Sequence, residues 1–327
     1  MKRREFIRLV GGATIALPLS AHGQERVRRI GVLSALGQTD TEVTRWFAAF
    51  QDSLQKLGWE QGRNIRIEYR WAGGDDQLLR SYVGELLGLA PDVIFAQGTP
   101  ALTALKERTR SVSIVFAQVS DPVKLGFVAN LAQPGGNVTG FANYEHPIGG
   151  KWVELITHIA PSVTRIAALF DSNNASNATY LEAIEAAAPS FKVQVTRADV
   201  RNADEIERAI TTFAQQPSGA TVVVPSVPTI LHRDLIITLA AQHRTPAVYP
   251  YRFYPTSGGL ISYGVDLPVL YRQAAGYVDR ILNGAKPGDL PVQFASKFEL
   301  IVNLKTAKAL GLTVPEPFLQ AADEVIE

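Results

Sequence analysis

The residues best suited to chemistry in this chain lack the spacing that catalysis or metal binding requires. No two of its histidines stand at the i, i+4 spacing of a metal-binding helix. Gly149-Gly150-Lys151 precedes Trp152, where a phosphate-binding loop needs serine or threonine, and the G-x-G-x-x-G, G-x-S-x-G and H-E-x-x-H motifs are absent. A catalytic triad whose members are far apart in the sequence remains an alternative, because only the fold would bring them together. We predict a protein that is not an enzyme and uses no cofactor or metal.

The composition narrows the class of partner. The 32 Lys and Arg residues nearly balance the 31 Asp and Glu residues, for a formal net charge of +1. Nucleic-acid binding normally requires a clustered basic excess, so we expect no nucleic-acid partner. The chain contains no cysteine, which excludes disulfides, thiolate metal sites and a lipid-modified N-terminal cysteine.

Polar residues follow several apolar runs, where strands would end and helices begin. These points carry Gly98, Thr99 and Asp121 in the first half, and Asn174 and Ser226 in the second. Ligands of open α/β sheets bind beyond the carboxyl ends of the strands, near unpaired helix N–H groups. Helix capping is a sufficient explanation for the presence of any one of these residues, and Thr99 is expected to be such a cap. Their recurrence in both halves favours a cleft shared by two lobes.

An aromatic segment at residues 249–255 offers a second kind of binding surface. Aromatic side chains such as that of Tyr251 supply stacking area at small entropic cost and are common in ligand pockets. Others in the segment must belong to the core. Arg252 is expected either to pair with a ligand carboxylate or to lie in solvent.

Short apolar runs alternate with helical patterns along the chain. We predict strands at residues 30–34, 65–69, 93–97 and 114–118, and, after an interruption at 134–137, at 166–170, 193–196, 221–224 and 247–249. One helical stripe consists of Val43, Trp46, Phe47, Phe50 and Leu54, and another follows Pro268 and ends at Asn283-Gly284. This alternation predicts an α/β fold with doubly wound parallel sheets.

The number of strands favours two lobes, because a single sheet of eight or nine strands is less common than two smaller sheets. We expect an N-terminal lobe of residues 24–141 plus 267–295, and a C-terminal lobe of residues 142–266 plus 296–327. Residues 259–266 and 298–303 are strand-like stretches where the chain is expected to pass between the lobes.

Residues 1–23 have the pattern of a secretory signal. A basic start precedes a short apolar stretch and a small-residue end. The apolar stretch is too short for a good membrane span. Arg3-Arg4-Glu5-Phe6-Ile7 resembles a twin-arginine export signal, although an ordinary secretory signal remains the alternative. We expect a soluble periplasmic protein without a lipid anchor.

Five segments together resemble a known family. They are residues 97–101 (QGTPA), 120–123 (SDPV), 134–140 (PGGNVTG), 262–266 (SYGVD) and 300–307 (LIVNLKTA), and they span nearly the whole mature chain. In this order they are similar to ABC-transporter substrate-binding proteins of the tryptophan/tyrosine type, which have the type I periplasmic-binding-protein fold. Each segment alone is weak evidence for this family, whereas the five segments in this order are specific for it.

The resemblance implies two lobes joined by a three-crossing hinge that close on a ligand, commonly an aromatic amino acid. With the residues noted above, it gives as candidate ligand-binding residues Ser34, Gly98, Thr99, Asp121, Tyr144, Ser172, Asn174, Ser226, Tyr251 and Asp266. Where relatives often carry an acidic Thr-Asp-Asn segment, this chain has Pro225-Ser226-Val227. An aromatic carboxylate or another compound with an uncharged tail is therefore also a candidate ligand.

We therefore expect the extracytoplasmic solute-binding component of an ABC importer. It would trap a small ligand by hinge closure, act as a monomer and deliver the ligand to a permease in the inner membrane. A periplasmic sensor that presents its ligand to a receptor or kinase is the alternative. An exported hydrolase is a third hypothesis. It would be distinguished from the other two by substrate turnover that disappears when a single polar residue is mutated.

Overall fold

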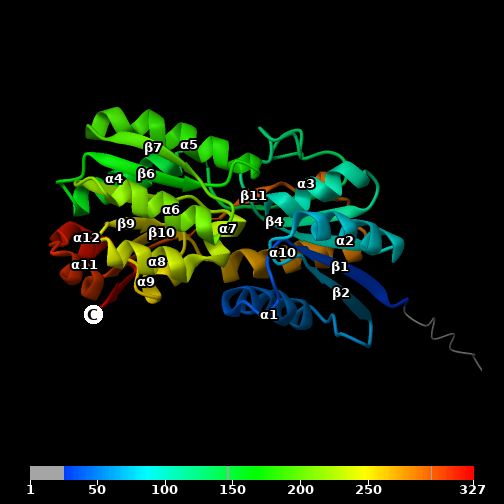
Figure 1. Cartoon of the computed structure of the whole chain (residues 1–327). Coiled ribbons are helices and arrows are strands. Elements are labelled where there is room, and N and C mark those ends of the chain that lie inside the picture. Colours follow the sequence, from blue (N-terminus) through cyan, green and yellow to red (C-terminus); the bar gives the residue numbers. More distant parts are fainter. Residues whose placement is uncertain (1–25, 146, 296) are drawn as a thin grey trace, which may run out of the picture.

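The computed structural model describes residues 26–145, 147–295 and 297–327, which form two α/β lobes (Figure 1). The first lobe has a six-stranded sheet of order β11-β5-β4-β3-β1-β2, with every neighbouring pair parallel. The second has a seven-stranded sheet of order β13-β12-β10-β9-β8-β6-β7. The predicted class of two parallel-sheet lobes is confirmed, with one exception. β12 runs antiparallel to β10.

The first lobe is built from two separate stretches of the chain. Its elements are β1 (Arg28–Ser34), α1 (Thr41–Lys56), β2 (Ile65–Trp71), α2 (Asp76–Gly88), β3 (Val93–Gln97), α3 (Gly98–Arg108), β4 (Ser113–Val119), β5 (Val138–Ala142), α10 (Leu267–Leu282) and β11 (Gln293–Phe294). Helix α10 returns from the second lobe and packs against α1 and β4.

The second lobe also consists of two stretches. Its elements are α4 (Ile148–Ile159), β6 (Arg165–Phe170), α5 (Ala175–Ala187), β7 (Gln194–Asp199), α6 (Ala203–Ala214), β8 (Gly219–Val223), α7 (Val227–Leu231), α8 (Arg233–Gln242), β9 (Ala247–Tyr249), α9 (Phe253–Thr256), β10 (Ile261–Val265), β12 (Phe298–Asn303), α11 (Leu304–Leu310), α12 (Glu316–Ala321) and β13 (Glu324–Ile326).

The chain crosses between the two sheets three times: after β5, after β10 and after β11. In Figure 1 the two lobes lie side by side, and α7 and α10 lie near the junction. Three crossings form a hinge about which two rigid lobes can close. This is the type I periplasmic-binding-protein architecture.

The helices form where the apolar periodicity predicts them. The five apolar residues expected on one face of α1 are all buried, and Asp40 caps this helix by accepting from the N–H groups of Glu42 and Val43. Helix α10 is capped by Asp266 and ends at Asn283, followed by Gly284 with a φ of +101°. A positive φ at glycine is a common helix stop.

Three local features differ from the sequence-based expectation. Residues 298–303 are not a crossing between the lobes but form β12 inside the second sheet, and the third crossing precedes them, after β11. Strand β5 was not predicted, because Thr139 and Gly140 interrupt its short apolar run. Gly140 has a φ of +154°, and a Cβ there would lie under 3.0 Å from the backbone of Phe116, so glycine permits β5 to approach β4. Thr99 does not cap α3, whose N-cap residue is Gln97.

One buried apolar cluster includes residues of both lobes, and a second fills the other face of the first sheet. Within the ranges that the structure describes, no helix is both long enough and apolar enough to cross a membrane.

Candidate functional site

A cavity lies between the lobes, at the carboxyl ends of their strands. It has about 420 Å³ of space not occupied by atoms, part of it open to solvent. The first lobe contributes Ala35, Leu36, Gln97, Gly98, Thr99, Pro100, Gln118, Ser120 and Asn143, and the second contributes Asn174, Ser176, Tyr180, Pro225, Ser226, Val227, Ile230 and Tyr251.

The two walls touch each other around this cavity. The Thr99 hydroxyl lies 2.7 Å from the Ser176 hydroxyl, and Ser120 is hydrogen-bonded to Tyr180. Farther out, Arg233 of α8 forms an ion pair with Asp40, which precedes α1. These contacts join opposite lobes, so the structure describes a closed arrangement.

A hydrogen-bonded chain of side chains forms the first lobe's wall. Ser34 donates to Gln97 Oε1 at 3.0 Å, Gln97 Nε2 donates to Gln118 Oε1 at 2.8 Å, and the hydroxyl of Tyr271 donates to the same Gln118 oxygen at 2.8 Å. Side chains that are bonded to one another in this way are held in fixed positions, which preorganises a binding wall.

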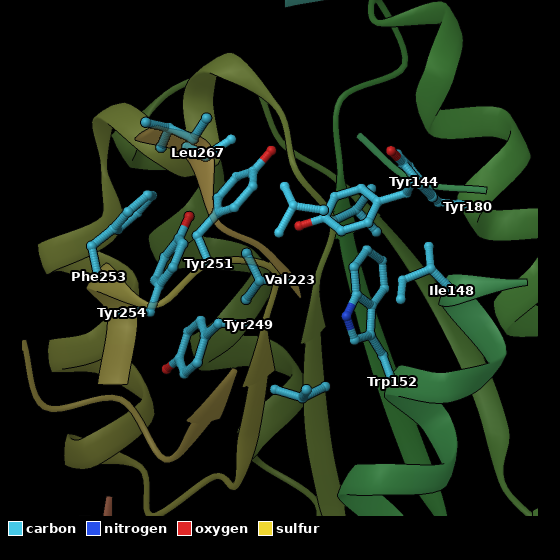
Figure 2. Packing of buried hydrophobic residues seen from close by; sticks show 14 of the residues in the cluster. Tyr144, Ile148, Trp152, Tyr180, Val223, Tyr249, Tyr251, Phe253, Tyr254 and Leu267 are labelled. Carbon is cyan, nitrogen blue, oxygen red and sulfur yellow. The ribbon is translucent and has the colours of Figure 1, made fainter. Parts of the chain in front are cut away.

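Tyr180 and Tyr251 line the cavity, and Figure 2 shows their rings close to that of Tyr144. The ring of Tyr144 lies between those of Tyr251 and Tyr180, with centroid separations of 6.1 and 6.0 Å. Burial raises the pKa of Tyr251 and of Tyr180 well above the ordinary tyrosine value, so both hydroxyls are neutral at physiological pH. The lining includes no Asp, Glu, Lys, Arg or His.

Five of the ten predicted site residues lie on the cavity lining: Gly98, Thr99, Asn174, Ser226 and Tyr251. Asn174 and Ser226 are also the N-caps of α5 and α7, so capping and placement at the cavity occur together. Gly98 has a φ of +84°, which turns the chain from β3 into α3 at little steric cost.

Three predicted residues lie just behind the lining. Ser34 supports Gln97, and Tyr144 donates to the carbonyl of Pro250 in the other lobe at 2.5 Å. Asp121 follows the lining residue Ser120, with a φ of +47° and a buried Oδ2 without a partner. A left-handed conformation at a non-glycine residue is strained and often occurs at functional sites.

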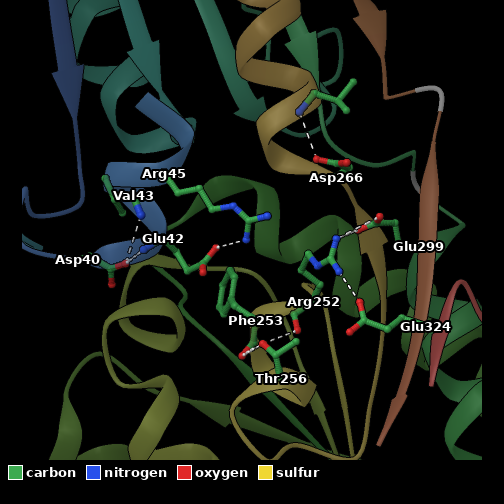
Figure 3. Close-up of polar contacts among 11 residues, drawn as sticks. Asp40, Glu42, Val43, Arg45, Arg252, Phe253, Thr256, Asp266, Glu299 and Glu324 are labelled. Atoms are coloured by element: carbon green, nitrogen blue, oxygen red, sulfur yellow. Dashed lines mark hydrogen bonds and ion pairs between the residues drawn. The ribbon is translucent and has the colours of Figure 1, made fainter. Parts of the chain in front are cut away.

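The remaining two predicted residues lie off the lining. The Ser172 hydroxyl donates to Asp199 at 2.8 Å, and Asp266 accepts from the N–H of Val269 at the start of α10 (Figure 3). Arg252 lies neither in solvent nor at the cavity. It pairs with Glu299 and Glu324 of the second lobe (Figure 3), and this ion pairing occupies its guanidinium.

Sequence reasoning missed six lining residues that carry hydrogen-bonding groups: Gln97, Gln118, Ser120, Asn143, Ser176 and Tyr180. Gln97 and Gln118 could have been found, because each is a polar residue at the end of an apolar strand run. Ser176 and Tyr180 lie one helical turn apart on α5, and no local pattern marks the face of that helix that meets the cavity.

The fold and the site define a two-lobed binding protein with a cavity between its lobes. The family model for ABC transporter substrate binding proteins matches residues 40–326, and the chain belongs to this family. It is a family of binding proteins and not of enzymes. Among the described residues, no group of three or more His, Cys, Asp or Glu side chains could hold a metal ion.

Several known proteins are similar to this chain. A tyrosine-binding protein of Clostridioides difficile is 26% identical over 267 residues, which are 80% of this chain and 75% of that protein. An ABC domain from Streptococcus pneumoniae, solved in complex with L-Trp, is 26% identical with a TM-score of 0.85, covering 91% of this chain and 99% of that one. A conserved domain protein from Vibrio cholerae is 28% identical with a TM-score of 0.86, covering 92% and 100%.

Proposed function

We propose that this chain is the extracytoplasmic solute-binding component of an ABC importer and traps a small ligand between its lobes by hinge closure. The observation that carries this proposal is the cavity whose walls come from both lobes. A ligand that contacts both walls binds the closed form better than an open form, and therefore shifts the population toward closure. The Thr99–Ser176 contact closes one side of the cavity.

The ligand that we propose carries an aromatic ring or a carboxylate group. Tyr180 and Tyr251 provide ring surface against which an aromatic group can pack. Gly98 and Thr99 belong to the first turn of α3, whose N–H groups lack intrahelical acceptors and favour an anionic or acceptor group. The tyrosine and L-Trp named for two relatives agree with an aromatic class.

We also propose a route and a location. Residues 1–23 would be an export signal of the twin-arginine type, and they lie outside the described residues. The mature protein would be a soluble periplasmic monomer without a lipid anchor, and would deliver its ligand to an inner-membrane permease. We propose lobe boundaries of 24–141 plus 267–295 and 142–266 plus 296–327. The membership of the two sheets supports these bounds except at the first crossing, where Ala142 ends β5 of the first sheet and Asn143 and Tyr144 follow it.

Two measurements on the purified mature protein test the binding function. Mass spectrometry of the denatured protein should detect a co-purified compound that is absent after unfolding and refolding in buffer. A thermal-shift screen against aromatic amino acids, aromatic carboxylates and branched-chain compounds should then raise the melting temperature for one class. A ligand at a hundred times its Kd adds about 2.7 kcal/mol. Absence of both signals would contradict the proposal.

Ser226→Ala and Asp121→Ala should each weaken ligand binding by about 1–3 kcal/mol, because a polar group of the bound ligand would lose its partner in a buried site. Ser226 lies on the lining. Asp121 follows the lining residue Ser120 and carries a buried oxygen that has no hydrogen-bonding partner. Calorimetric titration measures the change. Thr238→Ala is the control, since that hydroxyl is exposed on α8. Unchanged affinity in both variants would remove these residues from the site.

A further inference from the structure

One buried polar atom on the cavity lining has no hydrogen-bonding partner. Asn143 follows β5 at the first crossing between the lobes, and its exposed fraction is 4%. Its Nδ2 donates to the Tyr251 hydroxyl at 3.3 Å, whereas its Oδ1 bonds to nothing. Asn143 also lies on the cavity lining. The Oδ1 atom is therefore a buried acceptor on a lining residue that no described protein group uses.

A buried acceptor without a hydrogen-bonding partner is unfavourable inside a folded protein. Buried polar atoms are nearly always hydrogen-bonded, because removal from water without a replacement bond costs free energy. Five side-chain atoms of this kind occur among the described residues, on Arg29, Asp121, Asn143, Ser262 and Gln273. Only Asn143 among these five belongs to the lining. The missing partner of its Oδ1 is therefore expected from the bound ligand.

The other amides of the first lobe's wall are already engaged. Gln97 and Gln118 bond to each other, and further donors from Ser34 and Tyr271 occupy their oxygens. Their acceptors are therefore less available to a ligand than Asn143 Oδ1. This chain cannot rearrange without breaking several bonds, so the Asn143 oxygen is the amide acceptor of this wall that remains unengaged.

The surroundings of Asn143 indicate which kind of donor group can form a hydrogen bond to its Oδ1. No lining side chain carries a formal charge, and an amide oxygen balances a neutral N–H or O–H more completely than a full positive charge. The rings of Tyr144 and Tyr251 lie next to this position, which suits a donor carried on a flat ring. A phenol O–H and an indole N–H are groups of this kind.

We propose that Asn143 is a specificity-determining residue, whose Oδ1 accepts a hydrogen bond from an uncharged N–H or O–H on an aromatic ring of the ligand. This inference rests on the proposed binding function and deepens it. The ring end of the ligand then lies at the hinge, beside Asn143 of the first crossing and Tyr251 after β9. Closure of the lobes buries that hydrogen bond.

The test compares ligands that differ only in the ring donor. The pairs are L-tyrosine with L-phenylalanine, 3-(4-hydroxyphenyl)propionate with 3-phenylpropionate, and indole-3-propionate with its N-methyl derivative. Calorimetric titration of the native protein should give about tenfold tighter binding for the donor-bearing member of at least one pair. Asn143→Leu, which is similar in size and has no acceptor, should abolish that difference.

Two further variants keep the test decisive. Asn143→Ala removes the same oxygen without the bulk of leucine, so it serves if the leucine variant does not fold. Asn283→Leu places the same substitution at the exposed end of α10 and should retain the discrimination. Discrimination that persists without Asn143, or preference for the member lacking the donor, would overturn the inference. If none of these compounds binds while mass spectrometry still detects a co-purified ligand, the role of Asn143 is overturned too, but the proposed binding function is not.

Discussion

Arg233→Met should weaken ligand binding by at least about 2 kcal/mol, or about 30-fold, although Arg233 does not line the cavity. Its guanidinium pairs with Asp40 of the other lobe, and the two side chains are only 15% and 9% exposed. Removal of Arg233 leaves the buried Asp40 carboxylate without its cationic partner and with only the N–H groups at the start of α1 to stabilise it, which destabilises the closed form. The apparent affinity falls with the population of the binding-competent form.

The measurement is calorimetric titration with the ligand identified by mass spectrometry, together with the radius of gyration from small-angle scattering. We expect Arg233→Met to be more extended than the native protein without ligand. Methionine retains apolar contact with Phe253, over whose ring the guanidinium lies at 5.7 Å. Asp40 still caps α1 in this variant.

A second ion pair between the lobes supplies the matched control. Lys124 and Glu182 lie 2.7 Å apart, with side chains that are 51% and 55% exposed. An exposed pair contributes about 0–1 kcal/mol, so Lys124→Met should change the affinity severalfold at most. Equal effects of the two substitutions would show that burial of the Arg233–Asp40 pair does not govern closure.

Gly264→Ala should destabilise the folded protein by about 3–5 kcal/mol, which combines overpacking with the loss of a buried hydrogen bond. A Cβ at this position in β10 would lie under 3.0 Å from the carbonyl of Pro250 and from the Tyr144 hydroxyl. Those two groups are hydrogen-bonded across the hinge. The methyl group can be accommodated only by shifting backbone, because its nearest clash is with the backbone carbonyl of Pro250.

Thermal unfolding monitored by circular dichroism measures this loss. Gly276→Ala is the control, because a Cβ at that position in α10 meets no atom within 4 Å. In the interior of a helix, alanine is about 1 kcal/mol more favourable than glycine, so this variant should melt at the same or a higher temperature. A melting temperature of Gly264→Ala equal to that of the native protein would contradict the packing described here.

Much of the fold could be predicted from the sequence. β3 and β9 occupy the predicted residues, and the other six predicted strands correspond to strands displaced by a few residues at their ends. Periodicity also placed α1 and α10, because burial of one face requires an apolar residue at each helical repeat. β5 was missed, since its fit beside β4 depends on Gly140 and not on an apolar run.

The candidate site could be predicted only in part. Strand ends and helix starts marked Thr99, Asn174 and Ser226, which do lie on the lining. The same reasoning selected Ser172, whose hydroxyl bonds to Asp199 instead, and passed over Ser176, whose hydroxyl meets Thr99. These serines are four positions apart, and only the direction of each side chain in the folded protein distinguishes them.

The sequence by itself determined the alternation of elements, the two-lobed class and the strand-end positions, because these depend on apolar spacing and on turn residues that are close neighbours in the chain. The tertiary structure alone decided which groups meet. Asp40 and Arg233 are 193 positions apart, and Asn143 reaches Tyr251 across the hinge. Such pairs arise from the packing of distant elements, which local patterns do not encode.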